Sequence, residues 1–300
     1  MKKLTFHKMH GCGNDYIYID AIQKDPLPGD KSDIVRRLSD RHFGVGGDGV
    51  VFILPSKRAD FRMRMFNQDG SEAEMCGNAI RCVGKYLYDF GYTQKTTLKI
   101  ATKAGVKNLW LHTENGKVSS VSVDMGTVSV EQETKSADSK ISKSAKRSNA
   151  SKNQKTNQPK QRANQPLLAD MGITRVNVGN PHEVRVLFPQ ELDQLPDILI
   201  PWNKQANNEW ACIEHSSSLT TNSSLPYDVR MRVWERGTGE TLACGTGAVA
   251  VAATFIESGV THKKINVHLR GGTLQVERLE NGHYILTGEA KYIYKGEFVI

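Results

Sequence analysis

Apolar and polar residues alternate in two short segments of nearly identical sequence, FRMRMF (Phe61–Phe66) and VRMRVW (Val229–Trp234). A period of two is typical of a strand with one buried face. Each segment follows a β-rich stretch, YIYID at 16–20 and VRVLF at 184–188, and leads through a polar turn to the dipeptide Cys-Gly. The pattern therefore predicts the same succession of strands and turn at two places in the chain.

A helix is predicted after each Cys-Gly dipeptide. In the first, apolar residues between 80 and 87 recur at helical spacing. The second, in the segment GAVAVAATFIESG at 247–259, is apolar nearly all round, so we expect it to be buried on most sides. Gly91 and Gly259 each suit the position that follows the last residue of a helix.

The chain contains an internal repeat. An offset of 168 residues relates, without a gap, FRMRMF to VRMRVW, Glu72 to Glu240, Cys76-Gly77 to Cys244-Gly245 and Gly91 to Gly259. We expect an N-terminal repeat domain at 1–126, an insertion or linker at 127–168 and a C-terminal repeat domain at 169–287. The predicted fold class is α/β with two pseudo-symmetric domains. Their sheets should be mixed or antiparallel, because the long alternation typical of a doubly wound fold is absent.

Composition indicates a soluble globular protein, with 38% hydrophobic and 24% charged residues. No run of about 18 apolar residues could span a membrane. The N-terminus has two lysines without an apolar segment behind them, so we expect no signal peptide and a cytoplasmic location.

The net charge of +8 is concentrated in one segment. Residues 131–166 contain nine basic and three acidic side chains and no aromatic residue, which leaves +2 for the rest of the chain. Such a composition cannot form a packed core, so we expect a disordered insertion. A nucleic-acid-binding arm is the alternative, but the aromatic residues that stack on bases are missing.

The repeat places Cys76 and Cys244 at equivalent positions, each at the start of a predicted helix. Since equivalent halves tend to meet at equivalent positions, we expect the two thiols to face one cleft from opposite sides. Inversion of a carbon centre needs a base on one face and an acid on the other, and a thiolate and a thiol can supply both. Isolated cysteines are usually small buried hydrophobes, but this paired placement favours catalysis.

Around these cysteines the sequence resembles the diaminopimelate epimerase family. The matching segments are KMHGCGNDYIYID, HFGVGGDG, FNQDGSEAEMCGN, GNPH, NNEW, VWERGTGETLACGTGA and the late GG-TL, which span nearly the whole chain apart from the insertion. The resemblance implies a pyridoxal-phosphate-independent isomerase that interconverts LL- and meso-diaminopimelate for lysine and peptidoglycan precursor synthesis. It also implies two domains, each curled around a central helix, with the active site in the cleft between them and a last strand, 288–300, that returns to the first domain.

The resemblance further implies a homodimer that needs no cofactor. From the composition and spacing we also expect no metal, no specific nucleic-acid partner and no membrane partner. Cys76 and Cys244 look like the acid/base pair, and His182 and Glu235 resemble the residues that tune the thiol pKa values. The implied substrate contacts are Asn14, Asn67, Gly77, Asn78, Asn180, Asn207, Glu235, Arg236, Gly245 and Thr246. Many amide partners suit a substrate whose two ends are both zwitterionic.

The chain departs from the family pattern at Gly49, where some relatives have Gln, so we expect one side-chain contact to be absent or made by the backbone. The runner-up function is a related racemase for another amino acid, such as histidine, but Asn67 and Arg236 favour a substrate with two amino-acid ends. A thiol redox or metal protein is a third class, and the absence of CxxC pairs speaks against it.

Overall fold

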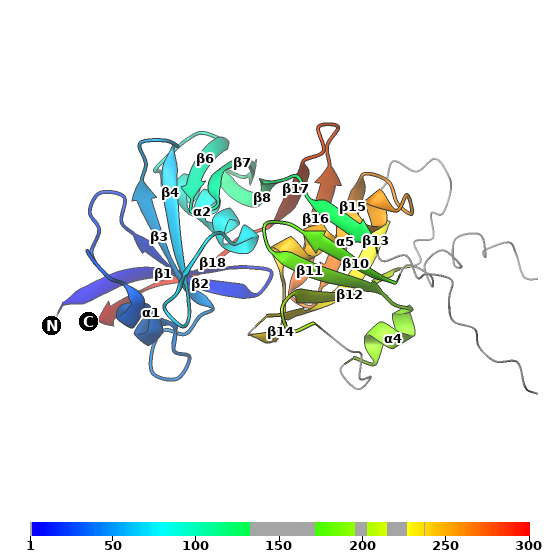
Figure 1. Ribbon diagram of the computed structural model, residues 1–300. Coiled ribbons are helices and arrows are strands. Elements are labelled where there is room, and N and C mark those ends of the chain that lie inside the picture. Colours follow the sequence, from blue (N-terminus) through cyan, green and yellow to red (C-terminus); the bar gives the residue numbers. More distant parts are fainter. Residues whose placement is uncertain (1, 133–171, 196–202, 215–226, 237) are drawn as a thin grey trace, which may run out of the picture.

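The computed structural model describes residues 2–132, 172–195, 203–214, 227–236 and 238–300. Most of the insertion predicted at 127–168 therefore lies outside the described residues. In the described part the chain forms two halves, which lie side by side in Figure 1.

The two halves are built from similar elements in the same order. The N-terminal half contains β1 (Lys3–Gly11), β2 (Asn14–Asp20), α1 (Ser32–Ser39), β3 (Gly49–Pro55), β4 (Phe61–Asn67), β5 (Glu72–Ala73), α2 (Gly77–Asp89), β6 (Thr97–Thr102), β7 (Gly105–Glu114) and β8 (Lys117–Gly126). The rest of the described chain contains β9 (Ser129–Gln132), β10 (Ile173–Asn177), β11 (Pro181–Val186), α4 (Pro189–Asp193), β12 (Asn207–Ile213), β13 (Tyr227–Glu235), β14 (Gly239–Thr241), α5 (Gly245–Glu257), β15 (Lys264–Leu269), β16 (Gly272–Arg278), β17 (Tyr284–Glu289) and β18 (Lys291–Val299).

Strand pairing repeats as closely as the sequence does. In the first half β2 pairs parallel with β3 and β4 parallel with β6. In the second half β11 pairs parallel with β12 and β13 parallel with β15. The other pairings in the described part are antiparallel. The predicted α/β class with mixed sheets is confirmed.

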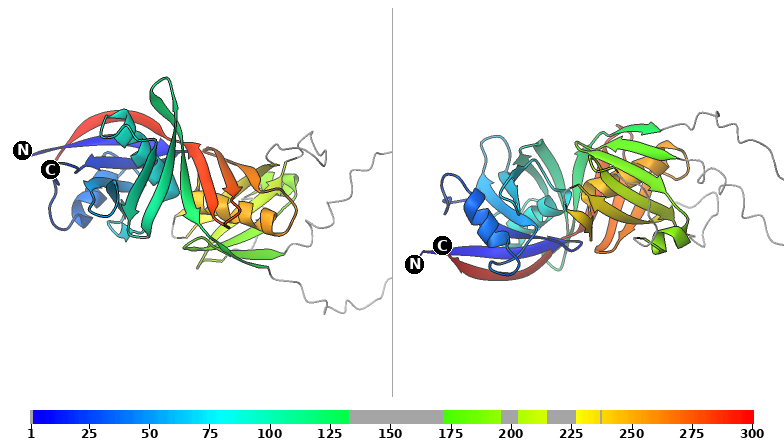
Figure 2. Two further views of the ribbon diagram at one scale, coloured as in Figure 1. Left: turned by 90° about the horizontal axis from the view of Figure 1, so that it is seen from above. Right: turned by 60° about the horizontal axis from the view of Figure 1, so that its bottom comes forward.

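The last strand of each half pairs with a strand of the other half. β18, from the end of the chain, pairs antiparallel with β1, and β9 pairs antiparallel with β10. Figure 2 shows β18 lying along β1 beside the N-terminus. β8 and β17, which precede the crossing strands, pair with each other. Residues Ser129–Gln132, assigned to the linker from their composition, form β9 instead, because they complete the sheet of the second half.

The two central helices are buried, and each is capped by the residues that the repeat indicates. Cys76 is the N-cap of α2 and Cys244 is the N-cap of α5. Gly91 and Gly259 adopt positive φ angles of 80° and 72° just after the C-caps, a conformation that glycine adopts without steric cost. α5 is buried from Gly247 to Phe255, as predicted. One continuous apolar core includes residues of both helices.

The starts of α2 and α5 meet where the halves join. A Cβ atom added to Gly245 would lie 3.6 Å from Cα of Gly77 and 3.1 Å from a methyl group of Leu286. A Cβ atom on Gly77 would lie equally close to that methyl group, at 3.1 Å. At 3.1 Å the Leu286 methyl group would have to move by a few tenths of an ångström, whereas 3.6 Å is an ordinary contact, so the two glycines leave room for the close approach that brings the N-caps together.

Leu286→Ala should destabilise the protein by about 2–5 kcal/mol, because the side chain is fully buried between the two helix starts and its loss leaves a cavity. The midpoint of urea unfolding measures the change. Val106→Ala, at a side chain that is 48% exposed, is the control and should cost less than about 0.5 kcal/mol. Equal losses in both variants would contradict the packing described here.

Candidate active site

Cys76 lies among predicted site residues of the N-terminal half. Its Sγ donates to Oδ1 of Asn14 at 3.4 Å, and Nδ2 of Asn78 donates to the same oxygen at 3.3 Å. Nδ2 of Asn78 also lies 3.4 Å from the carbonyl oxygen of Ala243, in the other half. The first turn of α2 is therefore tied directly to the segment that precedes Cys244.

Cys244 lies in the equivalent place at the start of α5 and is 6% exposed. Its Sγ accepts the backbone N–H of Gly247 at 3.4 Å and lies 3.4 Å from Oγ1 of Thr246. Nδ2 of Asn207 is 3.9 Å from the sulfur, and Oδ1 of Asn207 accepts the backbone N–H of Arg236 at 2.9 Å. The structure thus brings Asn207, Thr246 and Cys244 together.

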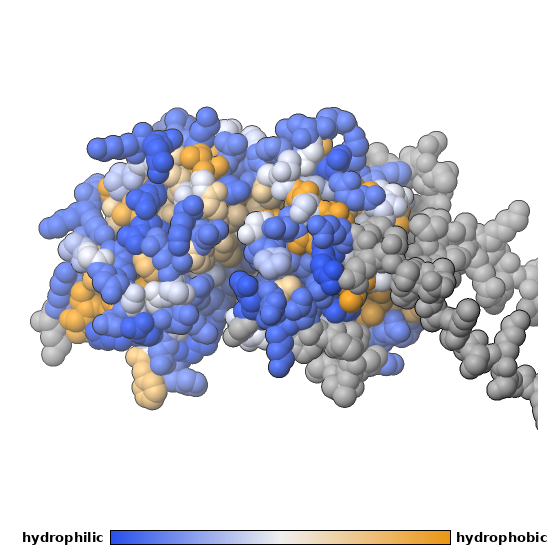
Figure 3. Space-filling view, in the orientation of Figure 1, coloured by the Kyte–Doolittle hydropathy of each residue, from blue (hydrophilic) through white to orange (hydrophobic). Residues whose placement is uncertain are grey.

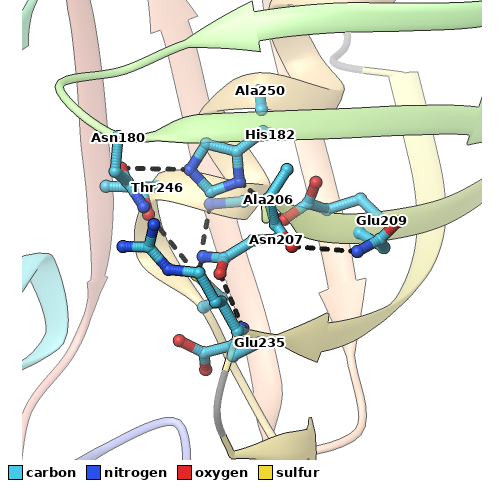
Figure 4. A network of polar contacts seen from close by, with 12 residues as sticks. Asn180, His182, Ala206, Asn207, Glu209, Glu235, Thr246 and Ala250 are labelled. Carbon is cyan, nitrogen blue, oxygen red and sulfur yellow. Dashed lines mark hydrogen bonds and ion pairs between the residues drawn. The ribbon is translucent and has the colours of Figure 1, made fainter. Parts of the chain in front are cut away.

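His182 and Glu209 form a buried pair near the start of α5 (both are labelled in Figure 4). Nδ1 of His182 lies 2.7 Å from Oε1 of Glu209, and Nε2 lies 3.1 Å from Oδ1 of Asn180. Glu209 also touches the first turn of α5, since a Cβ atom on Gly247 would lie 2.7 Å from its Oε1. Glu209 therefore connects His182 with the helix that carries Cys244.

A second carboxyl group, that of the partly buried Glu235, lies near Cys244. Its Oε1 accepts a hydrogen bond from Oγ1 of Thr241 at 2.5 Å. Burial raises the pKa of the Glu235 carboxyl group, and the nearby charge of Glu209 raises it further, while hydrogen bonds from Thr241 and Cys244 oppose the rise. Cys244 therefore has two acidic neighbours.

The surroundings favour the protonated form of both thiols. Burial raises the pKa of Cys76, and N–H groups of Ala79 and Asn78 partly oppose this. Burial raises the pKa of Cys244 well above the ordinary thiol value, and the charges of Glu235 and Glu209 raise it further. A helix N-terminus stabilises an anion by roughly 0.3–2 kcal/mol, which does not outweigh burial beside two carboxylates.

Two predicted substrate contacts are held by local backbone or side-chain partners. Nδ2 of Asn67 donates to Oγ of Ser71 at 3.0 Å, within its own turn. Nη1 of Arg236 donates to the carbonyl oxygen of Gln205 at 3.5 Å, and its side chain is exposed. In the described part of the chain no hydrogen bond joins either side chain to a thiol, so their role as substrate contacts stays a prediction.

Gly49 has no room for a side chain. A Cβ atom there would lie 2.0 Å from the carbonyl oxygen of Phe66, on the neighbouring strand β4. A side-chain contact is therefore not available at this backbone position.

Three residues beside the thiols are absent from the sequence-based set. Tyr16 hydrogen-bonds the Cys76 thiol and thereby opposes the rise of its pKa. Asp48 binds Asn14, and Glu209 binds His182. All three lie within the motifs GNDYIYID, GGDG and NNEW, but only the folded chain shows which members of a motif contact a thiol or one of its neighbours.

Neither a metal site nor a membrane-spanning helix is found among the described residues. No group of three or more His, Cys, Asp and Glu side chains in this part of the chain is arranged to hold a metal ion. No helix there is long and apolar enough to cross a membrane. The visible face is largely hydrophilic and is indented where the two halves join (Figure 3).

The family model for diaminopimelate epimerase matches residues 6–131 and 174–293. The chain belongs to the diaminopimelate epimerase family. Diaminopimelate epimerase of Methanococcus maripaludis (strain C5) is 44% identical over 99% of this chain and 100% of its own length. That of Acetivibrio thermocellus is 41% identical over 98% of both chains. The family prediction made from the two cysteine motifs is confirmed.

Solved structures of other proteins share the fold of this epimerase family member. A phenazine biosynthesis protein of the PhzF family from Bacillus anthracis superposes with a TM-score of 0.67, at 18% identity and over 100% of both chains. A hydroxyproline epimerase from Agrobacterium vitis superposes with a TM-score of 0.61, at 15% identity, over 99% of this chain and 91% of its own. At such low identity the likeness concerns the fold alone.

Glu235→Gln should lower the pH at which Cys244 becomes reactive, because the negative charge of Glu235 is one cause of the raised thiol pKa. Removing that charge favours the thiolate, so the midpoint moves down. The measurement is the rate of Cys244 modification by methyl methanethiosulfonate as a function of pH, read by peptide mass spectrometry. Glu240→Gln is the matched control, because Glu240 pairs with Arg232 on the same hairpin. The same midpoint in wild type and Glu235→Gln would refute the electrostatic coupling.

Proposed function

We propose that the protein interconverts LL- and meso-diaminopimelate, with Cys76 and Cys244 as the acid/base pair. The observation that carries the proposal is the placement of two free cysteines as N-caps of two helices whose starts meet. The repeat puts these caps in equivalent positions on the two sides of one junction. Membership of the diaminopimelate epimerase family supports the substrate.

In this mechanism one cysteine acts as a thiolate and removes the α-proton from one face of the substrate. The opposite thiol then delivers its proton to the other face of the same carbon. The first sulfur ends as a thiol and the second as a thiolate, so protons balance and the configuration is inverted. The reverse reaction uses the same groups in exchanged roles.

The two helix starts suit the reacting end of the substrate. The first N–H groups of a helix lack intrahelical partners and carry about half a positive charge. Two such ends together favour the α-carboxylate, on which negative charge grows as the proton leaves. Oδ1 of Asn78 is buried without a hydrogen-bond partner in the described part, and an α-ammonium group could donate to it.

The distal end of the substrate needs partners of its own. We assign these to Asn67, Asn180, Asn207 and the Glu235-Arg236 pair, with Arg236 as the fork for the distal carboxylate. Asn207 links both ends, because its amide lies between Cys244 and the backbone of Arg236. The homodimer, the cytoplasmic location and the absence of a cofactor stay predictions, and sedimentation of the purified protein tests the first.

Cys76→Ala and Cys244→Ala should each lower epimerisation by several orders of magnitude, because each thiol serves one face. The assay incubates the protein with LL-diaminopimelate in deuterated water and follows α-deuterium and configuration. Wild type should place one deuterium on each inverted α-carbon. Cys212→Ala is the control, since this buried cysteine belongs to a separate apolar cluster. Full turnover by either cysteine variant would contradict the two-base mechanism.

Arg236→Met should lower kcat/KM for LL-diaminopimelate about ten- to a hundredfold, the effect of losing one charge-assisted contact worth about 1.5–3 kcal/mol. Slow α-deuterium exchange on L-lysine, which has one amino-acid end, should change much less. Equal losses for both substrates would show that Arg236 contacts the reacting end or stabilises the fold. If wild type turns over a one-ended amino acid better than diaminopimelate, the racemase alternative replaces this assignment.

A further inference from the structure

Asn14 touches the Cys76 thiol, and Asp48 determines how Asn14 is turned. Nδ2 of Asn14 donates to Oδ2 of Asp48 at 2.6 Å. The same carboxylate oxygen accepts the backbone N–H of Asp15 at 3.1 Å, and the backbone N–H of Asp48 donates to the carbonyl oxygen of Asp15 at 2.7 Å. Asp48 is thus fixed to the start of β2 by two backbone contacts, and its Oδ1 accepts from Nη2 of Arg41 at 2.9 Å.

The carboxylate of Asp48 allows only one orientation of the Asn14 amide. An amide group has a donor end and an acceptor end, and only the donor end can face a carboxylate. With Nδ2 held by Asp48, Oδ1 must point the other way, toward Sγ of Cys76. Nδ2 of Asn78 donates to that oxygen as well and favours the same orientation.

A carbonyl oxygen beside a sulfur favours the thiol over the thiolate, because only the thiol has a proton to donate. The other groups that face Cys76 act in both directions. The Tyr16 hydroxyl and the N–H groups of Ala79 and Asn78 favour the thiolate, whereas the charge of Glu235 disfavours it. Asn14 can therefore favour either form of Cys76. It favours the thiol when Oδ1 faces the sulfur and the thiolate when Nδ2 does.

We propose that Asp48 is a positioning residue that turns the Asn14 amide so that Cys76 keeps its proton before substrate binds. The carboxylate acts through Asn14, and it does not itself touch the sulfur. In the direction in which Cys76 is the acid, this is the proton that it delivers to the substrate. The inference rests on the proposed acid/base role of Cys76 and extends it to the motif GGDG, which has no part in the set of sequence-based contacts.

The test measures the pH dependence of Cys76 alkylation by iodoacetamide, with each cysteine followed as its own peptide. Asp48→Ala frees the Asn14 amide to present Nδ2 to the sulfur, so the midpoint for Cys76 should fall by about one pH unit, the effect of one hydrogen bond to a charged group. Asn14→Ala should lower the midpoint too, because the acceptor for the S–H group is lost.

The decisive comparison is the double variant. If Asp48 acts through the amide, Asp48→Ala should add no further change in the Asn14→Ala background. If Asp48 acts only through its charge, the change should be as large there as in wild type, and the proposal would be wrong. An unchanged midpoint in Asp48→Ala alone would overturn it as well.

Cys82 provides a control for folding within the same samples, because it lies on α2 and is fully buried. If Asp48→Ala exposes Cys82 to the reagent, Asp48→Asn replaces it, since one Asn oxygen can still accept both the Asp15 N–H and Nδ2 of Asn14 without the charge. The amide of Asn14 then keeps its orientation, so the Cys76 midpoint should stay within about 0.3 pH units of wild type, and a fall of about one pH unit in folded Asp48→Asn would show that the charge alone acts and would overturn the proposal. Epimerase activity of wild type is assayed separately: its absence would refute the proposed function, whereas the alkylation midpoints test Asp48 alone.

Discussion

The close approach of the two helix starts is the constraint on which the site depends. Gly77 and Gly245 allow the first turns of α2 and α5 to meet over Leu286. Because each helix is capped by a cysteine, this contact also sets where the two thiols lie. The exchange of β9 and β18 between the halves holds the contact in place, since neither half can complete its sheet without the other.

The electrostatics of the site work against ionised thiols. Burial raises both thiol pKa values, and the charges of Glu235 and Glu209 raise that of Cys244 further. The helix N-termini contribute about one positive charge between them, which is too little to reverse this without a bound ligand. In the proposed reaction the substrate brings an ammonium group to the same place, so ionisation of a thiol and occupation of the cleft are expected to occur together.

Sequence reasoning located the architecture because the repeat is strong at the residues that shape it. The offset that links Cys76 to Cys244 also links the helix-ending glycines, and both pairs occupy the predicted positions. It did not locate Glu209, because a carboxylate within the segment NNEWACI gives no signal of the histidine that it contacts in the folded chain. β9 was missed for a related reason: its short segment becomes a strand only through β10 of the other half.

The two halves differ in the residues that surround the two thiols, and the proposed chemistry gives a physical reason. Because the acid and the base act on opposite faces of one carbon, they need equivalent positions in the two halves, and the internal repeat provides them. The distal end of diaminopimelate is not inverted, so its contacts must come from one side in both isomers. The two thiols accordingly have different neighbours: Asn14 and Tyr16 beside Cys76, Glu235 and Asn207 beside Cys244. A symmetric pair of sites would bind either end of the substrate equally and could not hold one end fixed while the other is inverted.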